Sequence, residues 1–305
     1  MSGRVDATYA RPVSRAKSSW QVADHQARRL GLGAARLAGW WLTPQRWPAP
    51  QRFAPGVHGS MEALVGTVCA ALTRADDGAE PALEAGKRRN VALGAPAFDG
   101  VVITPDRPLS FWRTLGPATE RRGYTWGVEL RGGCVVPAIA GGLCLLSNAL
   151  FELAARAGWH VLERHGHSLE AIPLPPGALP LDATVAFPYI DLVVAPREGP
   201  VRLAVRVDAD ALVVEAFAAR PPGERVELTA EEQIVTRGGD TLRRSRVVRR
   251  RLDAEGATLG VEEVARSERR ILGPDERRRS CLTCGEHTCR DRPAEPTLVA
   301  LRARR

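Results

Sequence analysis

The sequence predicts an α+β protein, with helices toward the N-terminus, a central mixed α/β domain and an antiparallel β-rich segment after it. Three patterns predict this class. Apolar residues recur every three to four positions before residue 95 and again at 144–157. Apolar and polar residues alternate from residue 183 onward, and paired glycines separate short alternating runs. A chain of 305 residues is long enough to bury a full core.

We divide the chain by changes in composition and pattern. The predicted parts are an N-terminal helical region at 1–85, a central domain at 86–200, a β-rich extension at 201–265, and a charged, cysteine-rich tail at 266–305.

The N-terminal region is predicted to hold helices at 21–42, 61–75 and 82–93, joined by loops. Residues 21–42 end before Pro44, and four prolines make 43–59 an extended connector. Residues 61–75 read as a helix because Leu64, Val68 and Leu72 fall on one helical face.

The central domain is predicted to alternate short strands with one strong helix. A strand is expected at 100–105, and a hairpin at 126–130 and 134–138. A helix with a broad apolar face follows at 144–157, and Gly158 stands where a glycine commonly ends a helix. A further strand is expected at 159–164.

The segment from residue 183 onward is predicted to be entirely β. The expected strands are 184–187, 190–195, 201–207, 212–217 and 226–229, followed by a strand pair around Gly238 and Gly239. Six arginines lie between Arg243 and Arg251. We interpret them as one solvated face of that pair, with binding of a phosphate-rich ligand as the alternative.

The charge of the chain bears on its partners and location. The net charge is +8, but only two of the basic residues are lysines, which indicates a general preference for arginine rather than a nucleic-acid site. Nucleic acid is therefore not an expected partner. The first 20 residues lack the apolar core of a signal peptide, and the apolar run at 31–42 is too short to span a bilayer. The expected location is cytoplasmic.

Cys144 is the leading candidate for chemistry, because it stands where a glycine turn meets a predicted helix. A helix N-terminus lowers the pKa of a thiol, and the free amides of its first turn can stabilise an oxyanion. His165 or His167 on the next element could act as the base, and Asp182 or Asp191 could orient the imidazole. The alternative is that Cys144 is a small buried residue without a chemical role.

Several short blocks of the sequence occur together in a known family. They include Lys87 to Ala92, Pro108 to Trp112, Leu115 to Pro117, Arg122 to Tyr124, Gly141 to Cys144, Glu163 to Ser168, Asp182 to Val185, and Asp191 with Leu192. With these blocks, residues 87–194 resemble the VanW family, named for an accessory protein of vancomycin-resistance clusters. Ala140 and Leu145 depart from it, since the family usually has glycine and glutamine there.

The resemblance implies a role in cell-wall metabolism, peptidoglycan or glycopeptide antibiotic resistance, but it supplies no reaction. Substrate contacts are expected from Gly141 and Gly142, whose backbone can approach a ligand closely, and from Arg122 and Tyr124 in a matching block. We expect cysteine-dependent acyl transfer or amide hydrolysis on a cell-wall precursor. The alternative is a non-catalytic module that binds a precursor or a partner enzyme.

The tail contains a separate cluster of metal-binding residue types. Cys281, Cys284, His287 and Cys289 follow a C-x2-C-x4-C spacing with the histidine inside it. Two thiolates in a C-x2-C turn can bind one ion, which predicts a structural zinc site, with an iron–sulfur cluster as the less favoured metal centre. The other interpretation is an arginine-rich tail whose thiols bind no metal.

Overall fold

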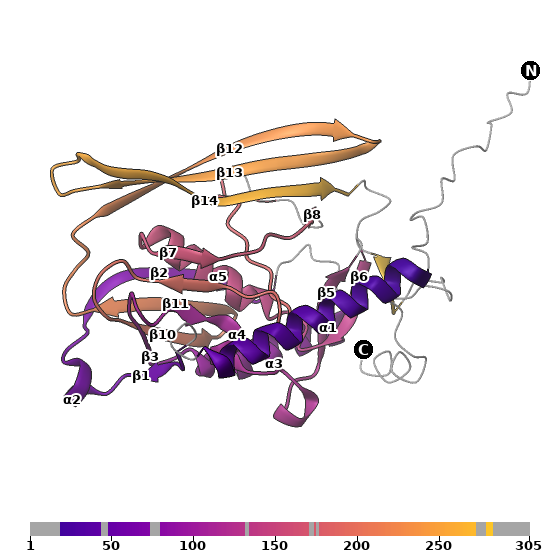
Figure 1. Cartoon of the computed structure of the whole chain (residues 1–305), viewed down its shortest axis with the longest axis horizontal. Helices are drawn as coiled ribbons and strands as arrows, with labels where there is room; N and C mark the ends of the chain where they lie inside the picture. Colours follow the sequence, from indigo (N-terminus) through magenta and orange to yellow (C-terminus); the bar gives the residue numbers. More distant parts are fainter. Residues whose placement is uncertain are drawn as a thin grey trace, which may run out of the picture.

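The computed structural model describes residues 19–43, 48–73, 80–131, 134–170, 174, 177–272 and 279–282, and it describes the side chains from Leu30 onward. These residues form an α+β protein, as predicted, with helices packed beside several sheets of mainly antiparallel strands (Figure 1). No helix in these ranges combines the length and apolar character needed to cross a membrane.

A five-stranded antiparallel sheet forms the centre of the fold. Its order is β1 (Gln51–Arg52), β3 (Val101–Ile103), β10 (Val201–Asp208), β11 (Ala211–Ala218) and β2 (Ala63–Ala71). Helix α5 (Cys144–Arg156) packs on β2 and β11 and buries Leu146, Leu150 and Leu153 completely. The sheet joins strands from the predicted N-terminal, central and β-rich parts of the chain. It gives α5 a rigid base.

The helix predicted at 61–75 is wrong, because these residues form β2. The register of β2 on β11 pairs Leu64 with Phe217 and Gly66 with Ala216, so Val65 is an extra residue in a β-bulge. The bulge shifts the alternation of inward and outward side chains by one position. A strand with such a shift presents apolar residues at spacings that also fit a helix.

Smaller elements surround this sheet. The helices are α1 (Ser19–Leu42), α2 (Pro55–His58), α3 (Pro81–Gly94) and α4 (Phe111–Leu115), with 3-10 turns η1 (Ala95–Ala97) and η2 (Glu120–Arg122). One three-stranded sheet has the order β15 (Arg279–Ser280), β6 (Cys134–Ile139) and β5 (Trp126–Arg131). Another has the order β4 (Leu109–Ser110), β9 (Val193–Ala195) and β7 (His160–Glu163).

Most of these elements confirm the sequence prediction. The first helix, the helix at 82–93, the hairpin of β5 and β6, and α5 all lie where the periodicity placed them. Gly158 has a φ of 78° directly after α5, as expected for a helix-ending glycine. The strand predicted at 184–187 is wrong, because that stretch contributes only one isolated bridge, from Ala186 to Ile190.

A long sheet made of β12 (Arg225–Arg237), β13 (Asp240–Leu252) and β14 (Thr258–Ile271) lies beside the body of the molecule (Figure 1). The short strand β8 (Leu169–Glu170) joins its edge in parallel. The turn between β12 and β13 has positive φ at Gly238 and Gly239, which is the two-residue hairpin geometry that the sequence predicts.

The arginines of β13 do not form one solvated face. Arg244, Arg246 and Arg250 are about half exposed and pair with glutamates on the neighbouring strands. The other three of the six, Arg243, Arg249 and Arg251, are more buried, and each also pairs with a glutamate. The side chains alternate between the two faces of the strand, so the cluster is a set of internal ion pairs.

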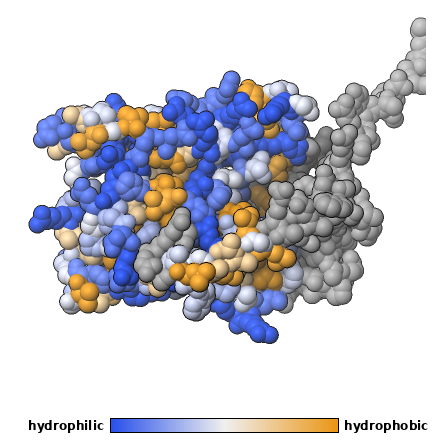
Figure 2. Space-filling model, viewed as in Figure 1, coloured by the Kyte–Doolittle hydropathy of each residue, from blue (hydrophilic) through white to orange (hydrophobic). Residues whose placement is uncertain are grey.

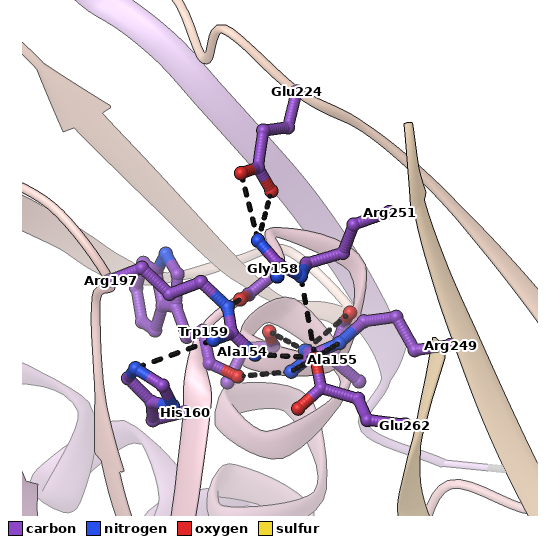
Figure 3. Close-up of polar contacts among 10 residues, drawn as sticks. All are labelled: Ala154, Ala155, Gly158, Trp159, His160, Arg197, Glu224, Arg249, Arg251 and Glu262. Atoms are coloured by element: carbon purple, nitrogen blue, oxygen red, sulfur yellow. Dashed lines mark hydrogen bonds and ion pairs between the residues drawn. The ribbon is translucent and has the colours of Figure 1, made fainter. Parts of the chain in front are cut away.

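Arg249 attaches this sheet to the end of α5 (Figure 3). Its side chain is fully buried, and its guanidinium donates to the carbonyls of Ala154, Ala155 and Trp159 at 3.3, 3.1 and 2.6 Å. Glu262 of β14 balances the charge at 3.1 Å. Carbonyls in the last turn of a helix lack helical partners. The Ala154 carbonyl also accepts from the Trp159 amide at 2.9 Å, and the buried arginine adds a charged donor to this end of the helix.

Candidate functional site

Cys144 is the first residue of α5, and a tight turn leads into it. Ala140 and Gly142 have φ values of 62° and 97° in this turn. The amides of Leu145 and Leu146 already donate to the carbonyls of Gly142 and Leu143, both at 3.0 Å. These two amides are therefore committed to the turn and are not available for the oxyanion role expected of first-turn amides.

Close packing explains both glycines of the turn. A Cβ on Gly141 would lie 2.4 Å from the carbonyl carbon of Gly127 in β5, and a Cβ on Gly142 would lie 2.4 Å from Cγ of Lys87 in α3. The fully buried Asn90 of α3 also fixes the turn, because its side-chain amide donates to the Gly141 carbonyl at 3.0 Å. Close packing of the turn thus explains why these two positions are glycine. Their predicted contact with substrate stays a prediction.

The side chain of Cys144 is half-buried and lies beside three groups from later in the chain. Its Sγ is 3.9 Å from Oγ1 of Thr184. The imidazole of His167 and the backbone amide of Val185 also lie near enough to this thiol to lower its pKa. The sequence therefore brings residues that are 23 to 41 positions from the cysteine to its sulfur.

His167 is oriented by Asp182. Nδ1 of the imidazole lies 2.9 Å from Oδ2 of Asp182, and the backbone amide of His167 donates to the same oxygen at 2.7 Å. Because Nδ1 faces the carboxylate, Nε2 is the ring nitrogen left for the thiol. The imidazole is 36% exposed, so the site is open to solvent on the histidine side.

Arg164 fixes the position of Asp182. Its Nη2 donates to Oδ1 of Asp182 at 2.9 Å, and its Nε donates to the backbone carbonyl of the same residue at 2.6 Å. The guanidinium also donates to the carbonyl of Arg266 and to the hydroxyl of Ser267, both on β14. The side chain of Arg164 is only 6% exposed, so it connects the site to the long sheet from inside the protein.

Helix α5 holds the segment that carries Asp182. The hydroxyl of Ser147 donates to the carbonyl of Ala183 at 2.6 Å, and the amide of Ala183 donates to Oδ1 of Asn148 at 2.7 Å. Both side chains project from the first turns of the helix that begins at Cys144. The cysteine and the aspartate are thus placed relative to each other by one rigid element.

The electrostatics of these groups favour a charged pair. Burial raises the pKa of the Cys144 thiol, but the hydrogen bond and charge of His167 outweigh it and hold the pKa below its usual value. Burial lowers the pKa of His167, whereas its bonds to Asp182 and Cys144 raise it to about 10. Despite burial, the pKa of Asp182 is lowered by His167 and Arg164. This arrangement shifts the balance toward a thiolate beside an imidazolium.

The other predicted partners lie elsewhere. His165 is about half exposed, and its Nε2 lies 3.2 Å from Oε1 of Glu163. Asp191 is fully buried and accepts from the Ser110 hydroxyl and the Trp112 amide at the start of α4. Burial raises the pKa of Asp191 to about 6. Of the two histidines and two acids that the sequence left open, the structure brings His167 and Asp182 to Cys144.

Arg122 and Tyr124 lie in the loop after α4. Nη1 of Arg122 donates to the carbonyls of Leu115 and Pro117 at 2.8 and 2.7 Å, which closes this loop on itself. The side chain of Tyr124 is buried, and the guanidinium of Arg122 lies 5.9 Å from its ring centre. Their expected contact with substrate stays a prediction.

The predicted metal site falls mostly outside the described residues, since Cys284, His287 and Cys289 are not among them. Cys281 is buried, and its amide donates to the carbonyl of Val135 in β6. Within the described ranges, no three histidine, cysteine, aspartate or glutamate side chains form a group suited to a metal ion. The zinc and iron–sulfur predictions therefore stay untested.

Sequence reasoning missed the roles of Arg164, Thr184 and Val185. One signal could have found Arg164 and Thr184: each is in the same short matching block as a residue of the site, Arg164 three positions before His167 and Thr184 two positions after Asp182. The contact of Val185 runs through its backbone amide, which no side-chain pattern can indicate.

Comparison with known proteins gives matches over the part of the chain that contains this site. A family model described as VanW like protein matches residues 86–217. The chain is 32% identical to "Uncharacterized protein YoaR" of Bacillus subtilis (strain 168) over 101 residues, which are 33% of this chain and 32% of that protein. It is 28% identical to "Vancomycin B-type resistance protein VanW" of Enterococcus faecalis (strain ATCC 700802 / V583) over 136 residues, 44% of this chain and 50% of that protein. The chain thus spans between a third and a half of these relatives, and no solved structure matches it.

Proposed function

We propose, from the match of residues 86–217 to the VanW-like protein family, that this protein is a cysteine-dependent enzyme of acyl transfer or amide hydrolysis. Its substrate would be a peptide or amino-acid-bearing precursor of the cell wall. In this proposal Cys144 is the nucleophile, His167 the general acid and base, and Asp182 the residue that orients and stabilises the imidazolium.

One observation carries the proposal: His167, whose Nδ1 lies 2.9 Å from Asp182, is close enough to Cys144 to lower the pKa of its thiol. A buried structural cysteine needs no histidine that an aspartate orients. Here the thiol pKa is lowered and the imidazole pKa is raised, and both shifts favour transfer of the thiol proton to the imidazole.

The reaction would proceed in two steps. The Cys144 thiolate adds to the carbonyl carbon of an amide, and the His167 imidazolium gives its proton to the leaving nitrogen as the C–N bond breaks. The product of this step is a thioester on Cys144. An amine or water then attacks the thioester and loses its proton to His167, and the C–S bond breaks to restore the thiolate.

The link to the cell wall rests on the relatives. One matched protein is named for vancomycin B-type resistance, and vancomycin acts on cell-wall synthesis. All three proposed catalytic residues lie within the matched residues 86–217. We therefore propose that the chain acts in cell-wall metabolism or in resistance to glycopeptide antibiotics.

The test is formation of an acyl-enzyme. The purified full chain is incubated with muropeptides released from peptidoglycan, and the intact mass and the Cys144 peptide are measured. We expect a thioester adduct on Cys144 that accumulates in His167→Ala less than in wild type. His165→Ala is the matched control, because this half-exposed histidine contacts Glu163 rather than the thiol.

The opposite outcome would favour a binding role. If wild-type protein and Cys144→Ala bind muropeptides with the same affinity, and no product or adduct forms, the catalytic proposal fails. The protein would then be a binding or accessory module that recognises wall precursors without converting them.

A further inference from the structure

We propose that the outer face of α1 docks on the surface of an anionic lipid membrane. This surface, the α1 face, consists of Leu30, Ala34, Leu37, Ala38 and Trp41, with Leu42 beside it. The proposal concerns where the protein binds and does not depend on the catalytic role of Cys144.

The α1 face is apolar and exposed over several helical turns. Leu30, Trp41 and Leu42 are 75%, 81% and 79% exposed, and Leu37 is also exposed. Leu30 and Trp41 are 11 positions apart, which places them on the same side of the helix. Figure 2 shows hydrophobic side chains gathered over α1 on this side of the molecule, within an otherwise largely hydrophilic surface.

The opposite side of α1 already accounts for its attachment to the protein. Trp40 is buried with its ring 6.4 Å from that of Phe187, and Arg36 pairs with Glu163 of β7 at 2.6 Å. Gly33 is also buried there, close to Pro188. The α1 face is therefore not used to attach the helix to the protein. Exposing a row of large apolar side chains to water is unfavourable in free energy, and a partner that covers them would offset this.

The charge of the segment that contains α1 indicates which kind of partner would cover the α1 face. Residues 25–61 contain five arginines and no aspartate or glutamate, and the arginines at 28 and 29 directly precede the apolar run. A basic helix with leucine and tryptophan on one face has the composition of interfacial helices, whose apolar face enters the lipid while basic residues face anionic headgroups. No helix among the described residues, α1 included, is both long and apolar enough to cross a bilayer.

A second copy of the chain is a weaker candidate for covering this face. A twofold contact between two α1 helices would bring two copies of this segment together, and apart from Arg36, which pairs with Glu163, its arginines have no acid within residues 25–61. A nucleic acid would match the arginines but would leave the leucines and Trp41 without an apolar environment. An anionic membrane satisfies both features at once.

The test uses the full chain and vesicles of two compositions. One set contains phosphatidylcholine alone, and the other contains phosphatidylcholine and phosphatidylglycerol in equal parts. We expect co-sedimentation to be at least about tenfold stronger with the anionic vesicles and to weaken at high salt. The double variant Leu30→Glu/Trp41→Glu should lose at least about tenfold of this binding.

The matched control is Leu259→Glu/Val261→Glu, which places two glutamates at exposed apolar positions of β14. It should bind within about twofold of wild type, as should Cys144→Ala. The proposal is overturned if wild type fails to bind anionic vesicles, if both double variants bind equally well, or if wild type is a dimer in solution that Leu30→Glu/Trp41→Glu dissociates.

Discussion

His167 contacts Asp182 twice: its backbone amide and its Nδ1 both lie within 2.9 Å of the same carboxylate oxygen. The backbone contact fixes where the carboxylate sits, and the ring contact fixes which nitrogen faces the thiol. A carboxylate in this position stabilises the imidazolium and, through it, the thiolate of Cys144.

Asp182→Asn tests that relationship, because it keeps the size of the side chain and removes its charge. We expect the pKa of His167 to fall and that of Cys144 to rise. Turnover of the muropeptide substrate should drop by about 10²–10⁴-fold, the range for loss of general acid–base catalysis. The measurement is kcat over KM across pH. Unchanged rates in a correctly folded variant would remove Asp182 from the mechanism.

Arg164→Met tests a positioning residue that acts through Asp182. Removing the guanidinium leaves a buried carboxylate with one partner fewer, and we expect a loss of about 3 kcal/mol in the free energy of unfolding. The pH profile of Cys144 reactivity should also shift upward, which a purely structural role would not cause. Arg266→Met is the control, because that side chain is 72% exposed. An unshifted profile in Arg164→Met would contradict the positioning role.

The raised pKa of His167 predicts how stability depends on alkaline pH. The unfolded histidine has a pKa of about 6.5, the folded one about 10. Between these two pKa values the folded state keeps a proton on His167 that the unfolded state has lost. The stabilisation of the folded state by this proton disappears as the pH rises through the folded-state pKa of about 10. Above about pH 8.5 the unfolded thiol is also ionised and no longer offsets this effect.

Urea unfolding at pH 8.5 and pH 10 measures this effect. We expect the stability difference between wild type and Cys144→Ala/His167→Gln to shrink over that interval, with the variant serving to cancel the titration of other groups. A difference that stays constant would contradict the assignment of a proton to His167.

Arg249→Ala tests the attachment of the long sheet to α5 (Figure 3). The change leaves the carbonyls of Ala154, Ala155 and Trp159 with a lost donor and Glu262 with a lost counter-charge. We expect a loss of about 3–5 kcal/mol in the free energy of unfolding. Arg250→Ala, at a neighbouring residue whose side chain is 53% exposed, should cost under about 1 kcal/mol. Equal losses of unfolding free energy in Arg249→Ala and Arg250→Ala would contradict the special role of Arg249 in this attachment.

Local sequence signals predicted most helices and hairpins. They failed where contacts between residues far apart in the sequence determine the structure. The amphipathic run of α5 and the paired glycines at 238 and 239 determine their structure locally. The bulge at Val65 arises only when β2 pairs with β11. The periodicity of residues 61–75 therefore indicated a helix where the chain forms a strand. Alternation along β13 could not reveal that Arg249 lies under α5, 90 or more residues away in sequence.

The candidate site was predicted in part. The glycine turn and helix start identified Cys144, and the histidine block limited the base to two residues. The choice between His165 and His167 depends on the path of residues 164–167 after β7 ends at Glu163, which the spacing alone does not determine. Asp182 is recognisable only once Arg164 and α5 fix its position.

The most direct test of the account is the pH dependence of Cys144 alkylation by iodoacetamide. The rate is followed by mass spectrometry of the peptide that contains Cys144, with the exposed Cys69 as an internal reference. We predict that Cys144 in wild type stays reactive at pH values below about 8.5, the usual pKa of a thiol, and that His167→Ala moves its midpoint upward. Identical profiles for wild type and His167→Ala would contradict the central claim that His167 holds Cys144 as a thiolate.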